Sequence, residues 1–169
     1  MSKITLITGG QRSGKSGYAQ QLALSLSPNP VYLATSRVWD DEHRLRIERH
    51  KAERSAEWTN IEEEKELGRH NLSGRVVLVD CITLWATNYF LDMQSDVDAA
   101  LKVLKEEFDK LVAQDARFVI VTNEVGMGGM SQNDIQRKFA DLQGLLNQYI
   151  AAKANEIFLM VSGIPLKVR

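Results

Sequence analysis

The sequence predicts an α/β fold, a three-layer sandwich in which a mostly parallel sheet lies between helices. Five short apolar runs, rich in β-branched residues, recur along the chain at residues 4–8, 31–34, 76–81, 118–123 and 156–162. Each run is continuous rather than alternating, which is typical of strands covered on both faces. Helical patterns separate most of these runs, and strand alternating with helix indicates parallel pairing through right-handed crossovers.

Length and composition indicate one compact domain over residues 1–169 with a small-molecule partner. The chain is 44% hydrophobic, enough for a full core, and its 21 basic and 22 acidic residues nearly cancel. That balance does not indicate a nucleic-acid or membrane-surface partner. The single cysteine, Cys81, excludes an internal disulfide framework and a cysteine-based zinc site. Because the chain shows neither a signal-peptide pattern nor 18 consecutive apolar residues, we expect a cytoplasmic protein without a membrane span.

The first strand, residues 4–8, runs directly into a phosphate-binding motif. Residues 9–16 match the pattern of glycine, four free residues and then Gly-Lys-Ser; they are Gly9, Gly10, Gln11, Arg12, Ser13, Gly14, Lys15 and Ser16. A strand, a tight loop and the helix predicted at residues 15–26 together aim backbone N–H groups and a helix N-terminus at one point. We therefore expect this loop to bind a nucleoside triphosphate. Lys15 would reach the β- and γ-phosphates, and the Ser16 hydroxyl would ligate Mg²⁺. The alternative is a glycine-rich turn that only caps a helix.

The stretch after the second strand is unusually charged. From residue 41 to residue 66, 15 of 26 residues are charged, against 25% over the chain. Asp40 is a plausible N-cap for a helix over residues 41–51 with little apolar face, so composition alone favours a solvated surface helix. The alternative is a catalytic role for His50, which lies on the same helix face as Ile47 and His43 and so can project to one side of the helix. A neutral imidazole is a competent nucleophile toward phosphorus.

The third strand, within residues 76–81, ends at Asp80. Nucleotide hydrolases and kinases keep the carboxylate that holds Mg²⁺ at the end of such a strand, although many strands end in Asp for turn reasons alone. Beside a phosphate loop, the magnesium role is favoured. An apolar helix that follows Cys81 is expected to lie in the core or in a subunit contact.

Two amphipathic helices are predicted in the second half of the chain, at residues 98–114 and 134–154. Between them, the strand at residues 118–123 is followed by Glu124 and by three glycines within residues 126–129. In parallel sheets the working groups gather beyond the carboxyl ends of the strands. This loop is therefore a candidate substrate-facing segment, and a long turn without a ligand is the alternative.

Several further motifs, together with the phosphate loop, give the chain its resemblance to a known family. They are Thr8-Gly9-Gly10, Arg12 to Ser16, Tyr32 to Ser36, Asp40-Asp41-Glu42, Arg46-Ile47 with His50, Trp58, Asp80 to Thr83, Thr122 to Gly128, Asn147-Gln148 and Ser162-Gly163. Over essentially its whole length the chain resembles the bifunctional adenosylcobinamide kinase / adenosylcobinamide-phosphate guanylyltransferases of corrinoid assembly. The combination of motifs is far more specific than the phosphate loop alone.

The resemblance implies two reactions on a corrinoid partner. ATP or GTP first phosphorylates the aminopropanol hydroxyl of adenosylcobinamide, and GTP then passes its GMP through a histidine to give adenosylcobinamide-GDP and pyrophosphate. The matching histidine is His50, and the magnesium positions are Ser16 and Asp80. The positions that match nucleotide contacts, besides the loop, are Thr35, Ser36, Arg37, Arg54 and Glu62. The family also implies a homotrimer, for which the segment at residues 84–93 could serve as a contact.

Two departures from the family pattern and two rival functions remain. Phe139-Ala140-Asp141 stands where relatives commonly have Phe-Arg-Asp, and Arg49 stands where some relatives have a second histidine. A GTP-binding switch would need Asn-Lys-x-Asp at a strand end, where residues 123–126 lack both the Lys and the Asp. The better alternative is a small-molecule kinase that uses the loop and Asp80 but never forms a covalent nucleotide.

Overall fold

A computed structural model describes residues 1–52 and 54–169, except for the side chains of Arg46 and His50. Within these residues, one seven-stranded sheet has the order β3-β2-β4-β5-β1-β6-β7. The strands are β1 Lys3–Gly9, β2 Val31–Ala34, β3 Thr59–Glu62, β4 Val76–Asp80, β5 Arg117–Asn123, β6 Glu156–Val161 and β7 Ile164–Lys167. Neighbouring strands pair in parallel except for β6 and β7, which form an antiparallel hairpin at one edge. The predicted α/β class with a mostly parallel sheet is therefore confirmed.

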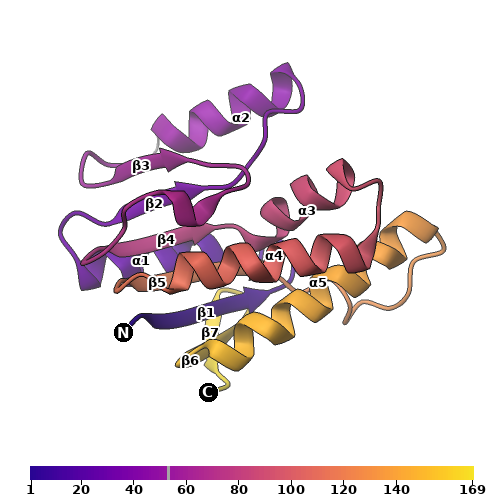
Figure 1. Ribbon diagram of the computed structural model, residues 1–169. Coiled ribbons are helices and arrows are strands. Elements are labelled where there is room, and N and C mark those ends of the chain that lie inside the picture. The colour runs from indigo at the N-terminus through magenta and orange to yellow at the C-terminus, as the bar shows by residue number, and fades with distance from the viewer. Residues whose placement is uncertain (53) are drawn as a thin grey trace.

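Helices cover both faces of the sheet, as Figure 1 shows. On one face lie α3 Ile82–Asp92, α4 Val97–Val112 and α5 Asp134–Lys153, while α1 Lys15–Leu26 lies behind the sheet. The remaining helix, α2 Asp41–Ala52, lies beyond the β3 edge. A short 3₁₀ helix, η1 Leu67–Arg69, packs against α4.

Each face of the sheet has its own apolar core. The larger core packs α3, α4 and α5 on the sheet and contains the fully buried rings of Trp85, Phe108 and Phe118. The smaller one lies under α1 and includes Tyr32, Trp58 and Cys81. Since strands covered on both faces need apolar side chains on both, this explains the continuous runs in the sequence.

The structure adds two strands that the sequence patterns did not indicate. β3 is polar, with half-buried and exposed residues alternating, and it lies at the sheet edge within the charged stretch. β7 contains Pro165 and is exposed along its whole length, which suits an edge strand because proline cannot donate to a central ladder. Both lack the apolar run that identifies a buried strand.

The predicted helices agree with the structure to within a few residues. The Asp40 cap is confirmed, since its carboxylate accepts the His43 N–H at 2.7 Å. Among the described residues, no helix is both long and apolar enough to cross a bilayer.

Candidate nucleotide-binding site

The phosphate loop connects β1 to α1 with the backbone geometry that its glycines allow. Gly14, with φ of 93°, is the N-cap of α1, and a Cβ added there would lie 3.0 Å from the Cα of Gly163. The N–H of Gly163 also donates to the Ser13 carbonyl at 2.9 Å. The turn between β6 and β7 therefore packs against the loop, and only glycine fits at position 14 without strain.

Lys15 lies inside this loop rather than in solvent. It is 7% exposed, and its ammonium donates to the Gly10 carbonyl and to Ser13 Oγ, the latter at 3.4 Å. Burial lowers the pKa of Lys15, while Cys81 and Asp80 act in the opposite direction. Because a triphosphate offers better acceptors than a carbonyl, the ammonium is positioned to exchange these contacts for phosphate oxygens.

A cavity of about 340 Å³ opens beside the loop. It brings together side chains from seven segments: Ser16 and Gln20 of α1, Tyr32 and Ala34 of β2, Ser36 after β2, His43 and Ile47 of α2, Arg54 after α2, Asp80 of β4 and Leu84 of α3. The predicted phosphate-loop serine and the predicted strand-end acid thus share one cavity. One hydroxyl and one carboxylate, completed by phosphate oxygens and water, are the ligands that Mg²⁺ prefers.

Asp80 has one direct neutral partner in this cavity, the Tyr32 hydroxyl, which donates to its carboxylate. Burial raises the pKa of Tyr32, and the Asp80 charge raises it further, so the phenol stays protonated. The sheet register explains the contact. Tyr32 pairs with Leu78 across β2 and β4, and Asp80 lies two residues further along on the same face of the sheet.

An aromatic and cationic cluster forms the wall nearest β2. The Arg54 guanidinium lies 3.6 Å from the centroid of the Tyr32 ring, and Tyr32 meets Trp58 edge to face at 5.5 Å. Arg54 also donates to Asn60 Oδ1 at 2.5 Å. The guanidinium of Arg54, lying on the Tyr32 ring, thus lines the same cavity as Ser16 and Asp80, the two predicted magnesium positions.

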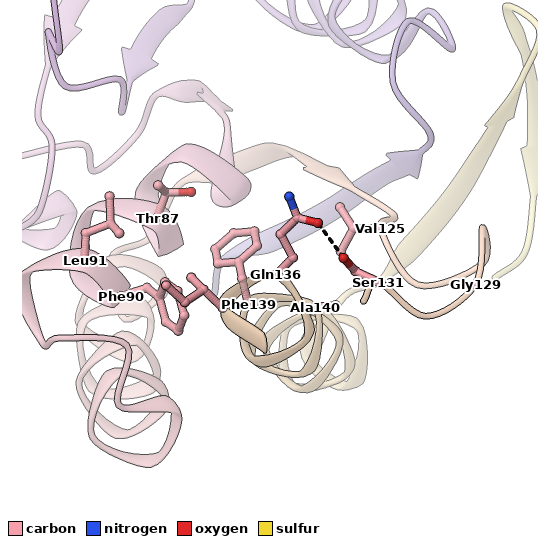
Figure 2. Close-up of a pocket in the computed structure, with 10 residues that line it drawn as sticks. Thr87, Phe90, Leu91, Val125, Gly129, Ser131, Gln136, Phe139 and Ala140 are labelled. Carbon is pink, nitrogen blue, oxygen red and sulfur yellow. Dashed lines mark hydrogen bonds between the residues drawn. The ribbon is translucent and has the colours of Figure 1, made fainter. Parts of the chain in front are cut away.

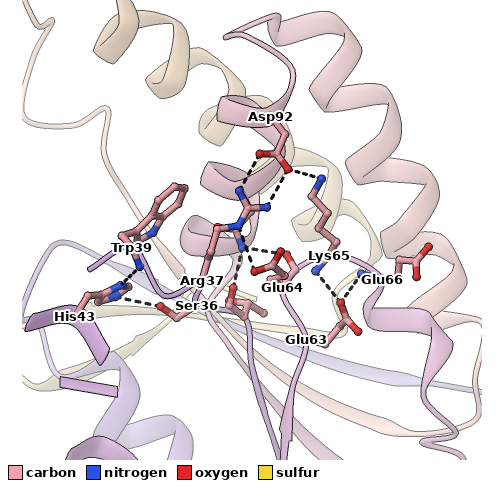
Figure 3. Close-up of polar contacts among 11 residues, drawn as sticks. Ser36, Arg37, Trp39, His43, Glu63, Glu64, Lys65, Glu66 and Asp92 are labelled. Carbon is pink, nitrogen blue, oxygen red and sulfur yellow. Dashed lines mark hydrogen bonds and ion pairs between the residues drawn. The ribbon is translucent and has the colours of Figure 1, made fainter. Parts of the chain in front are cut away.

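Ser36 and His43 both line the cavity, and their side chains point toward each other (Figure 3). The Trp39 N–H donates to His43 Nδ1 at 3.4 Å, and His43 Nε2 lies 3.2 Å from Ser36 Oγ, within hydrogen-bond distance. This contact joins the segment after β2 to the first turn of α2. His43 was not among the predicted site residues, although it shares a helix face with Ile47, which also lines the cavity.

Arg37 follows Ser36 but takes part in a different group of contacts. Its guanidinium donates to both Asp92 oxygens, at 2.8 and 2.9 Å, and to Glu64 Oε2 at 3.2 Å (Figure 3). Lys65 also pairs with Asp92. Hydrogen bonds from Arg37 and Lys65 hold the pKa of Asp92 well below its usual range. The structure thus ties Arg37 to the end of α3 rather than to the cavity lining.

Three other predicted site residues, Thr35, Glu62 and His50, are not among the described residues that line the cavity. Thr35 is fully buried, donates to the Cys81 carbonyl at 2.7 Å and accepts the Cys81 N–H at 3.0 Å, so it connects the end of β2 to the residue that precedes α3. Glu62, at the end of β3, pairs with Lys51 at 2.8 Å and does not line the cavity. Position 50 lies within α2, but the His50 side chain is outside the described part of the chain.

Comparison with known proteins gives a match along almost the whole chain. Residues 5–168 match the protein family described as cobinamide kinase / cobinamide phosphate guanyltransferase. The bifunctional adenosylcobalamin biosynthesis protein CobU of Escherichia coli is 38% identical over 179 residues, covering 97% of this chain and 98% of that protein. The corresponding CobP protein of Pseudomonas aeruginosa is 36% identical over 169 residues, covering 97% and 96%. Among solved structures, the flagellar accessory protein FlaH from Methanocaldococcus jannaschii is similar in fold, with a TM-score of 0.50 and 13% identity over 99% of this chain and 78% of that one.

Proposed function

Because the chain belongs to the cobinamide kinase / cobinamide phosphate guanyltransferase family, we propose that its α/β unit carries out both reactions on adenosylcobinamide. In the first reaction, the aminopropanol hydroxyl loses its proton and attacks the γ-phosphorus of ATP or GTP. The bond from that phosphorus to the β-phosphate oxygen breaks, and a nucleoside diphosphate is released. In the second, the His50 imidazole attacks the α-phosphorus of GTP and expels pyrophosphate. A phosphate oxygen of the corrinoid then attacks the same phosphorus, the bond to His50 breaks, and adenosylcobinamide-GDP is released.

The observation that carries this proposal is the shared cavity between the phosphate loop and α2. Ser16 and Asp80 line this cavity together with Ile47 of α2. Position 50 follows Ile47 by three residues, the spacing that places two helix positions on one face. The covalent route replaces one displacement between two bulky anions with two easier steps.

The residues of the cavity have separate roles in this scheme. Lys15 and the loop amides bind the phosphates, and Ser16 with Asp80 would hold Mg²⁺, which supplies charge neutralisation at the phosphoryl oxygens. Arg54, with Ser36, completes the nucleotide contacts. Thr35, Arg37 and Glu62 are proposed to act on the nucleotide only through the segments they hold in place, because their contacts in the structure are with other protein groups.

The guanylyl step separates this proposal from a plain small-molecule kinase. GTP labelled at the α-phosphorus should leave an acid-labile, alkali-stable label on the protein. His50→Ala should remove the label while ATP-dependent phosphorylation of cobinamide continues. His70→Ala is the matched control, since His70 pairs with Glu63 away from the cavity. A label that persists in His50→Ala, or a wild-type protein that takes no label, would leave only the kinase.

We also propose that the protein is cytoplasmic and, from its resemblance to the family, that it forms a homotrimer. Light scattering should then give about three times the chain mass of 19.1 kDa. A monomeric mass at working concentrations would contradict the trimer without affecting the chemistry.

A further inference from the structure

A second cavity, of about 420 Å³, lies between α3, α5 and the glycine-rich loop that follows β5 (Figure 2). Its walls include Phe90 and Leu91 of α3, Val125 of the loop, and Ile135 and Phe139 of α5. The rings of Phe90 and Phe139 meet edge to face, with their centroids 5.5 Å apart. None of the described residues that line it is charged. The cavity is thus suited to an apolar, uncharged part of a ligand.

Three uncharged polar side chains lie among these apolar walls: Thr87, Ser131 and Gln136. Ser131 Oγ donates to Gln136 Oε1 at 2.5 Å, which leaves the amide nitrogen of Gln136 to donate elsewhere (Figure 2). Hydroxyl and amide groups of this kind are the natural partners of neutral amides. A phosphate-bearing ligand would instead need cations.

The glycine-rich loop connects this cavity to the phosphate loop. The N–H of Glu124 donates to the Gly9 carbonyl at 2.9 Å, and its carboxylate accepts the N–H groups of Gly126 at 3.0 Å and Met127 at 2.8 Å. Val125 lines both the apolar cavity and a third cavity, whose wall includes Gly10 of the phosphate loop. An extended group could therefore start in the apolar cavity, cross Val125 and end beside the phosphates.

We propose that the apolar cavity is the corrinoid site, with the macrocycle edge between α3 and α5 and the aminopropanol arm directed over Val125 toward Gly10. This inference rests on the proposed function. A corrinoid is a broad, largely apolar ring bordered by neutral amide side chains, and the lining offers apolar surface together with uncharged hydrogen-bonding groups. The arm carries the hydroxyl to be phosphorylated, and the path ends where the γ-phosphate is expected.

The surroundings of the cavity fit a ligand that is only partly enclosed. A cavity of this volume holds one edge of a corrinoid, so the rest must lie against the protein surface. That surface carries exposed apolar side chains, with Met127 at 78%, Met130 at 89% and Leu91 at 46% exposure. Methionine side chains adapt to irregular ligand surfaces, which suits a macrocycle with substituents on both faces.

The test uses the full chain and two substitutions that change the cavity in different ways. Ala140→Phe fills the cavity from α5, and Leu91→Lys places a charge at its mouth. The matched controls are Ala152→Phe and Leu145→Lys, on exposed positions of α5 outside the cavity. Cobinamide affinity is measured by equilibrium titration, GTP affinity with a fluorescent analogue, and molecular mass by light scattering. GTP binding also reports whether each variant is folded.

We expect both cavity variants to bind cobinamide at least about tenfold more weakly, with GTP affinity within about twofold of wild type and both controls unchanged. If the wild-type protein binds cobinamide and the cavity variants bind it equally well, this inference fails while the proposed function stands. If Ala140→Phe changes the mass but not cobinamide affinity, the cavity is a contact between copies of the chain, which also overturns the inference. If the wild-type protein neither binds nor phosphorylates cobinamide, the proposed function itself fails.

Discussion

The hydroxyl of Tyr32 donates a hydrogen bond to the carboxylate of Asp80 across the β2–β4 pair, in the cavity beside the phosphate loop. The strand-end acid is therefore oriented by a neutral donor. An oriented carboxylate is suited to holding a divalent cation.

Asp80→Asn should abolish the metal role and leave the fold intact. The asparagine oxygen can still accept from Tyr32, but the neutral amide is a poor ligand for Mg²⁺. We expect kinase and guanylyltransferase rates to fall by about 10²-fold or more, with a higher magnesium requirement. Rates measured across a magnesium titration test this, with Asp115→Asn on the exposed surface as the control. Wild-type rates in Asp80→Asn would remove Asp80 from the metal site.

Tyr32→Phe should reduce stability, because it leaves the Asp80 carboxylate without its donor. A half-buried hydrogen bond to a charged group contributes about 1.5–3 kcal/mol, so we expect a loss of about 1.5 kcal/mol in the free energy of unfolding. Tyr149→Phe is the matched control, since that hydroxyl donates to Asp109 at an exposed site. There the loss should be under about 0.5 kcal/mol. Urea unfolding at neutral pH measures both, and equal losses would contradict the role given to burial.

The contacts of Arg37 allow its predicted nucleotide role to be tested. Asp92→Ala removes the bidentate partner, and Arg37→Ala removes the guanidinium itself. If Arg37 only positions the segment after β2, both variants should weaken GTP binding to a similar, small extent of about twofold to threefold. If the guanidinium instead contacts phosphate, Arg37→Ala alone should weaken GTP binding by about tenfold or more. GTP titration of the two variants and of the double variant distinguishes these outcomes.

Cys81 should resist alkylation in the native protein. Burial and the neighbouring Asp80 charge raise the pKa of its thiol to about 12. At pH 8 only about one thiol in ten thousand would then be ionised, against about a quarter for an unperturbed cysteine. Reactivity should rise with pH and should appear at once in denaturant. Iodoacetamide labelling followed by mass spectrometry measures this, and rapid native labelling at pH 8 would contradict it.

Two glycines should respond in opposite directions to substitution by alanine. A Cβ at Gly68 would lie 2.9 Å from Lys110 Cβ and 3.1 Å from Leu111 N. Gly68→Ala therefore forces η1 away from α4 and should lower the free energy of unfolding by about 1–3 kcal/mol. A Cβ added at Gly144, within α5, would meet no neighbouring atom within 4 Å. Gly144→Ala should therefore raise the free energy of unfolding by about 0.5–1 kcal/mol, because alanine has the higher helix propensity. Thermal melts of the two variants test the pair. A stabilised Gly68→Ala would show that η1 does not pack on α4 as closely as described.

The sequence predicted the fold class and the phosphate loop well because both depend on local patterns. A continuous apolar run identifies a buried strand wherever it lies, and residues 9–16 carry their geometry in their own glycines. The edge strands β3 and β7 were missed because their pairing depends on neighbours rather than on their own side chains.

The site was harder to predict for a similar reason. Asp80 and Ser16 were identified from their motifs, and the structure places both in one cavity. The partner of Arg37 lies 55 residues away, at the end of α3, and no spacing rule links the two. Tyr32 and His43 line the cavity through sheet register and helix phase, which become informative only when the strand order is known.

The hydrogen bond from Gly163 to Ser13 has a consequence for the folding of the chain during translation. The β6–β7 turn contacts the phosphate loop but is made 150 residues after it. A growing chain therefore carries the phosphate loop long before the turn that packs against it exists. Nucleotide affinity should therefore develop only after residue 163 has been made and the hairpin has left the ribosome and docked. Release of the finished hairpin, rather than synthesis of the motif, would set the moment at which the enzyme first engages its nucleotide.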